Sequence, residues 1–83
     1  MPRSTHTPDY KAMLELLREL RDRKGVLQAD LAGRLEVPQS YVSKSENGER
    51  RLDVLEVRAW CIALGVPFAD FSKELDKRLR KKG

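Results

Sequence analysis

Cysteine and histidine are nearly absent from this chain of 83 residues, which contains one of each, Cys61 and His6. One thiol cannot close an internal disulfide, and one His with one Cys supplies no cluster of the His and Cys ligands typical of a metal centre. We therefore expect neither a metal nor another cofactor. Cys61 stands in the middle of an apolar segment, and we expect it to be a small buried residue rather than a reactive thiol.

Long apolar runs are absent as well. No stretch approaches the roughly 18 apolar residues that cross a membrane, and the first ten residues, MPRSTHTPDY, contain no apolar segment of the signal-peptide type. The sequence also shows no nucleophile–base pair, no pair of catalytic carboxylates and no glycine-rich phosphate loop. These absences predict a cytoplasmic protein that is not an enzyme and has no membrane partner.

The length and the charge set further bounds. A chain of this size forms one small domain around a single core, and 40% hydrophobic with 36% charged residues is typical of a folded domain. Lys and Arg number 17 against 13 Asp and Glu, which gives a formal charge of +4. This excess favours an anionic partner without identifying it.

Helix signals divide the chain into five segments, so the expected fold class is all-α with one core. Thr7 is a suitable N-cap and Pro8 a suitable first residue for a helix that runs to about residue 24, where Gly25 stops it. Asp53 and Glu56 resemble a capping box, which predicts another helix from there to residue 64. Pro67 is expected to open a last helix.

The central stretch, residues 28–48, is predicted to form two short helices joined by a tight turn. Leu31, Ala32 and Leu35 share the inward face of the first helix, and Val42 points inward from the second. The outward face of the second helix is left free of core packing. It carries hydrogen-bonding side chains that suit base edges and phosphates: Gln39, Ser40, Ser43 and Lys44.

This stretch resembles the helix-turn-helix of the Xre and phage repressor/Cro family of DNA-binding domains. The resemblance extends from about Leu14 to Leu75. Its marks are the sequences LR at 20–21, QADLA at 28–32, SKSENG at 43–48 and ALGV at 63–66. It implies that residues 28–35 form the second helix of a five-helix repressor-like domain and residues 39–47 its recognition helix, with Gly48 turning the chain at positive φ.

Four positions depart from the family pattern. Glu36 stands where the turn commonly has Gly, so a residue with a side chain is expected at left-handed φ. Leu27 replaces the usual Ser or Thr cap, Ser45 replaces an apolar core residue, and Leu52 replaces the proline that often precedes the fourth helix.

The resemblance and the outward face together predict the DNA contacts. Glutamine can bond adenine bidentately and lysine can donate to guanine, and on this basis the expected base readers are Gln39, Ser40 and Lys44. Phosphate contacts position the helix without reading sequence. They are expected from Gln28, Tyr41, Ser43, Asn47, Arg50 and Arg51.

Arg21 continues the inward stripe of the first helix, where a guanidinium needs an anionic partner. Glu46, which leans inward from the recognition helix, is the candidate. The family resemblance also implies an Arg–Glu ion pair at these two positions. The alternative is that the two residues are independent surface charges.

Apolar residues beyond those the core needs predict a dimer interface. Leu55, Ala59 and Ile62 form a second apolar line on the fourth helix, while Leu75 and Leu79 extend the apolar stripe of the fifth. We expect a homodimer with Leu55, Ile62, Leu75 and Leu79 at its interface. The alternative is that the fifth helix folds back over the fourth and buries the same residues within one chain.

The expected organisation is a flexible arm over residues 1–7, a helix-turn-helix domain over residues 8–76 and a basic tail over residues 77–83. The expected function is sequence-specific binding of double-stranded DNA by a small transcriptional regulator. The resemblance implies a repressor or autoregulator of phage or bacterial type, which is expected to read a palindromic operator in the major groove as a homodimer.

Other uses of the same domain stay open. Antitoxins of toxin–antitoxin pairs and restriction-modification controllers share it, so a toxin or another protein partner is an alternative. A protein-interaction module without specific DNA binding is the alternative outside this class. Such a module should carry apolar or acidic residues at positions 39, 40 and 44, where this chain has Gln, Ser and Lys.

Overall fold

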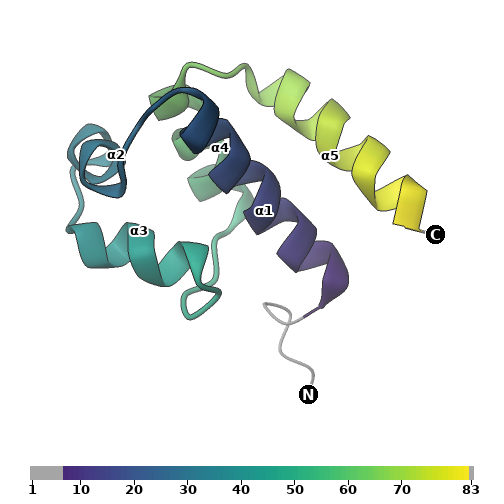
Figure 1. Ribbon diagram of the computed structural model, residues 1–83, viewed down its shortest axis with the longest axis horizontal. Helices are drawn as coiled ribbons and strands as arrows, with labels where there is room; N and C mark the ends of the chain where they lie inside the picture. The colour runs from purple at the N-terminus through teal and green to yellow at the C-terminus, as the bar shows by residue number, and fades with distance from the viewer. Residues whose placement is uncertain (1–6, 83) are drawn as a thin grey trace.

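The computed structural model describes residues 7–82, and the secondary structure of this part of the chain consists of helices alone (Figure 1). The all-α class predicted from the sequence is confirmed. Six of the seven residues of the expected N-terminal arm lie outside the described residues. The helices are α1 (Pro8–Arg23), α2 (Gln28–Leu35), α3 (Gln39–Glu46), α4 (Val54–Leu64) and α5 (Phe68–Lys82).

The two helix starts predicted from capping residues are confirmed. The Tyr10 N–H donates to the hydroxyl of Thr7 at 3.1 Å, directly before α1. At α4 the capping box is complete, because the Glu56 N–H donates to the Asp53 carboxylate and the Asp53 N–H donates to the Glu56 carboxylate, both at 2.8 Å. These side chains satisfy backbone donors that the first helical turn leaves without partners.

In Figure 1, α1 crosses the front of the molecule with α4 behind it, while α2 and α3 lie to the left and α5 lies to the right. The packing agrees: α2 contacts α3 and α4, whereas α5 contacts α1 and α4. The pair α2–α3 and the helix α5 therefore occupy opposite sides of a central α1–α4 layer. An interaction through α5 leaves α3 accessible to another partner.

The core lies where α1, α2, α3 and α4 meet. Its fully buried side chains are Leu16, Leu17, Leu31, Val42, Ser45, Trp60 and Cys61. The expectation for Cys61 is confirmed, and burial raises the pKa of its thiol to about 11, so the thiol is protonated at neutral pH. The Ser45 hydroxyl and the Trp60 indole N–H find no hydrogen-bond partner among the described residues.

Three of the four departures from the family pattern, at Glu36, Leu27 and Leu52, can be followed in the local backbone geometry. Glu36 ends α2 in the left-handed conformation at φ 60°, as expected. Leu27 provides no side-chain cap, and its own N–H donates to Asp30 at 3.0 Å. The N–H of Leu52 donates to the hydroxyl of Tyr10 at 2.8 Å. Proline has no N–H and could not make that bond.

The basic residues expected as a tail continue α5 as far as Lys82. Arg78 fixes this end of the helix to α1. Its guanidinium donates to both carboxylate oxygens of Glu19, at 2.8 and 3.1 Å, and to Glu74 at 3.1 Å. The hydrogen bonds to Glu19 raise the pKa of Arg78, and those from Arg78 lower the pKa of Glu19.

We expect Arg78→Ala to lower the free energy of unfolding by about 0.5–1 kcal/mol, because a bidentate pair between partly exposed groups is lost. Arg80→Ala is the matched control, since Arg80 pairs with Asp76 of the same helix at 3.1 Å and is more exposed. Urea unfolding at neutral pH compares the two. The Glu19 contribution is present above its unfolded pKa of about 4 and is lost as pH falls below it, so the Arg78→Ala effect should shrink there. Equal effects of the two changes would show that the Arg78–Glu19 pair, the clamp between α5 and α1, does not stabilise the fold.

Candidate nucleic-acid interface

Helix α3 presents two different faces. Val42 and Ser45 are fully buried against the core, whereas Gln39, Ser40 and Lys44 are exposed. Gln39 and Ser40 are the first two residues of the helix. In helix-turn-helix proteins the N-terminal residues of the recognition helix contact base edges. The three expected base readers therefore lie on the exposed side of α3.

The residues expected at phosphates lie on α3, on the loop after it and at the start of α2. Tyr41 and Ser43 are half-buried on α3, and Asn47 is exposed directly after it. Gly48 then turns the chain at φ 80°, and the loop continues through Arg50 and Arg51. Gln28 is the first residue of α2 and is also half-buried.

Arg21 of α1 and Glu46, the last residue of α3, form a buried ion pair. The Arg21 Nε donates to Glu46 Oε2 at 2.7 Å and Nη2 donates to Oε1 at 3.1 Å. Only 8% of the Arg21 side chain and 3% of the Glu46 side chain is exposed. Arg21 Nη1 also donates to the carbonyl of Val26 at 2.8 Å. Its bond to Glu46 raises the pKa of Arg21, so the guanidinium is charged at neutral pH.

Gln28 joins this ion pair, which sequence reasoning did not foresee. Its Nε2 donates to Glu46 Oε1 at 2.9 Å, so one carboxylate connects α1, α2 and α3. The contact depends on how α2 crosses α3, and helix periodicity carries no signal for that angle. The Gln28 side chain is thus held at the start of α2, beside the interface where a phosphate contact was expected from it.

A second cluster lies between the loop and α4, and sequence reasoning recognised only the capping role of its carboxylate. Arg50 Nη2 donates to Glu56 Oε2 at 2.8 Å, and the Arg50 guanidinium lies over the Tyr41 ring at 4.4 Å from its centre. The Tyr41 hydroxyl donates a longer bond, 3.5 Å, to the same Glu56 oxygen. The bond from Arg50 lowers the pKa of Glu56 and raises the pKa of Arg50.

Arg51, the next residue, is exposed and lies over the Tyr10 ring at 5.3 Å from its centre. Each of the two arginines of the loop therefore lies over the face of an aromatic ring. The ring face attracts a cation electrostatically.

The described residues contain no group of three or more His, Cys, Asp or Glu side chains placed to hold a metal ion. Within the same residues, no helix combines the length and the apolar character that crossing a membrane requires.

Comparisons with known proteins agree with this geometry. Residues 17–71 match the helix-turn-helix family. Among solved structures the chain is similar to an XRE-family like protein from Pseudomonas syringae pv. tomato str. DC3000, with 43% sequence identity and a TM-score of 0.83. The similarity covers 90% of this chain and 92% of that one. The comparison with curated proteins gives no match.

The family match spans the whole of α2, α3 and α4, which include the exposed polar face of α3 and the loop that follows it. The solved relative shares the fold over nearly its full length at an identity well above that of chance similarity. The chain therefore belongs to the XRE-type helix-turn-helix family of DNA-binding regulators.

Proposed function

We propose that this protein is a small transcriptional regulator that binds double-stranded DNA sequence-specifically in the cytoplasm of a bacterial cell. It acts as a repressor or autoregulator and reads a palindromic operator as a homodimer. One observation carries the proposal: α3 is anchored by buried Val42 and Ser45 and presents an exposed polar face that the fold itself does not use.

Base reading falls to the exposed residues of α3. When α3 lies in the major groove, Gln39 bonds the N6 and N7 atoms of adenine, Lys44 donates to guanine O6 or N7, and Ser40 bonds an adjacent base edge. These groups discriminate between base pairs because each pair presents its own pattern of donors and acceptors in that groove.

Phosphate contacts hold α3 in register. The groups that we assign to them are Gln28, Tyr41, Ser43, Asn47, Arg50 and Arg51. Asn47 follows α3 directly and the two arginines lie in the loop behind it, so that they meet the DNA backbone beside the groove that α3 occupies. Such contacts supply most of the affinity and its dependence on salt but carry no sequence information directly.

The exposed apolar residues of α4 support the homodimer. Three of the four exposed large hydrophobic side chains in the described chain lie on this one helix, namely Val54 at 62% exposure, Leu55 at 72% and Ile62 at 60%. A small monomer rarely leaves such residues together on one surface. A second copy is the natural cover, because palindromic half-sites require a two-fold pair of recognition helices about 34 Å apart.

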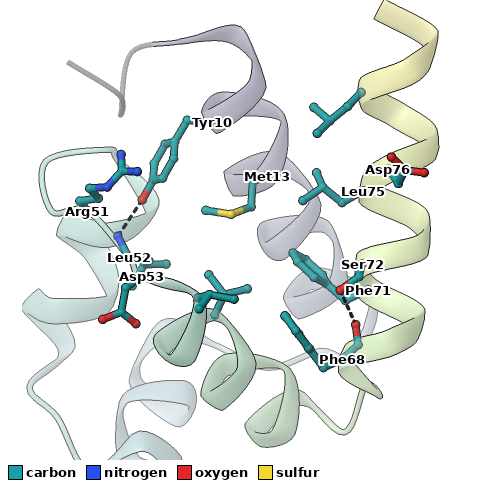
Figure 2. A pocket seen from close by; sticks show the side chains of 13 residues that line it. Tyr10, Met13, Arg51, Leu52, Asp53, Phe68, Phe71, Ser72, Leu75 and Asp76 are labelled. Atoms are coloured by element: carbon teal, nitrogen blue, oxygen red, sulfur yellow. Dashed lines mark hydrogen bonds between the residues drawn. The ribbon is translucent and has the colours of Figure 1, made fainter. Parts of the chain in front are cut away.

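Leu75 and Leu79 lie in a neighbouring groove between α1, the start of α4 and α5 (Figure 2). The groove has a volume of about 390 Å³ and is lined mainly by apolar side chains, among them Met13, Val54 and Phe71. Leu75 packs partly against the core of its own chain, whereas Leu55 and Ile62 do not line the groove. We assign the dimer surface to the exposed apolar side chains of α4 together with the rim of this groove. Val54 belongs to both parts of this surface.

Selection of bound sequences from a random duplex pool tests the proposed function and should return an inverted repeat. On that operator, Gln39→Ala should relax the preference at one base pair of each half-site and cost about 1–3 kcal/mol there. Its affinity for random DNA should stay nearly unchanged, since no charge is lost. Competition binding with single-position operator variants measures both quantities, and equal losses on operator and random DNA would remove Gln39 from the base readers.

A further inference from the structure

Glu56 is the meeting point of three elements that are separate in the sequence. One carboxylate oxygen accepts the N–H of Asp53 at 2.8 Å and completes the cap of α4. The other accepts Arg50 Nη2 at 2.8 Å and the Tyr41 hydroxyl at 3.5 Å. The start of α4, the basic loop and the recognition helix are thus joined through one side chain.

The same carboxylate determines where the Arg50 guanidinium points. Arg50 lies in a loop and 41% of its side chain is exposed, so without partners it would sample many rotamers. The bond to Glu56, a bond from Nη1 to the carbonyl of Arg51 at 3.2 Å and the face of the Tyr41 ring hold it in one orientation. A guanidinium has five N–H donors, so these bonds leave donors for a phosphate oxygen.

We propose that Glu56 is a positioning residue for DNA binding, which holds the Arg50 guanidinium in the orientation that meets one backbone phosphate. This inference rests on the proposed function. Glu56 does not touch the DNA itself. Because Glu56 already restricts the rotamers of Arg50 in the free protein, Arg50 loses less conformational entropy on binding. A preorganised side chain increases affinity in this way.

The proposal predicts an effect opposite in sign to that of simple electrostatics. A carboxylate near the DNA backbone repels phosphates, so its removal alone should strengthen binding. If Glu56 positions Arg50, its removal should weaken binding although a negative charge has gone. Glu49 is the matched control, because it is an exposed acid in the same loop, whereas among the described residues the hydrogen-bond partners of the Arg50 side chain are Glu56 and the Arg51 carbonyl.

Glu56→Gln is the appropriate variant, because glutamine serves the capping box as well as glutamate does but forms no ion pair with Arg50. We expect operator affinity to fall about three- to tenfold, with a parallel fall on random DNA because phosphate contacts are independent of sequence. Glu49→Gln should leave affinity equal or slightly higher. Fluorescence anisotropy at several salt concentrations measures both, and thermal melting verifies that each variant is folded.

A double-variant cycle separates positioning from a structural role. In an Arg50→Ala background, Glu56→Gln should no longer weaken binding, since there is no guanidinium left to orient. If Glu56→Gln binds as tightly as or more tightly than wild type, or weakens binding equally with and without Arg50, the inference is overturned. If the wild-type protein selects no DNA sequence and binds duplexes no better than its charge predicts, the proposed function itself fails.

Discussion

Glu46→Ala is expected to lower the free energy of unfolding by about 3 kcal/mol or more, because it leaves the Arg21 guanidinium buried without its counter-charge. Arg21 would retain the carbonyl of Val26 as an acceptor and a longer, 3.8 Å ion pair with the exposed Asp22, but no buried carboxylate. The Gln28 amide would lose its partner as well. For a domain of this size the melting temperature should fall by on the order of 15 °C. Circular dichroism during a thermal ramp provides the measurement.

Two further variants complete this experiment. Glu49→Ala removes an exposed glutamate three residues away and should change stability by no more than about 0.5 kcal/mol. The double change Arg21→Met with Glu46→Leu should recover much of the loss, since a buried pair replaced by apolar groups of similar volume leaves no charge without a partner. If Glu46→Ala and Glu49→Ala melt alike, the buried pair is not important for stability.

Formation of the proposed dimer is expected to depend on Leu55 and Ile62. The double change Leu55→Glu with Ile62→Glu should convert the dimer to folded monomers and reduce operator affinity strongly, because two half-sites would no longer be bound as one unit. Both side chains are more than half exposed within one chain, so the substitutions bury no charge in the monomer. Sedimentation velocity measures the mass, and circular dichroism verifies the helices.

Arg58→Glu with Ala59→Glu makes a useful comparison, since both residues are exposed on α4 between the two apolar ones. It should weaken the dimer too if the interface covers the whole exposed side of the helix. A Leu55→Glu, Ile62→Glu protein that remains dimeric, or that unfolds, would show that these residues do not form the interface.

The helices were largely predictable because their signals are local. Thr7 and the Asp53–Glu56 box mark helix starts through bonds between residues three positions apart. The left-handed φ of Glu36 could be assigned because the family pattern has glycine at that position. The facing positions of Arg21 and Glu46 were also inferred, since each departs from the expected polarity of its own helix face and the family resemblance implies the same pair.

Contacts that depend on how separate elements pack against each other were not predictable in the same way. The bond from Gln28 to Glu46, the Arg50–Glu56 pair and the Arg78–Glu19 clamp each join residues of different elements. Helix periodicity fixes the face on which a residue lies but not the neighbour that this face meets.

The bond between the Leu52 N–H and the Tyr10 hydroxyl has a consequence for protein engineering. Substituting family-average residues is a common route to greater stability, because most such changes repair local defects. At position 52 that approach would introduce proline, delete the N–H and leave the buried Tyr10 hydroxyl without this donor. At position 36 the family residue should instead stabilise the protein, because glycine adopts the left-handed φ of 60° without the strain that the side chain of Glu36 brings. Family frequencies alone do not distinguish the two positions, whereas the backbone geometry does.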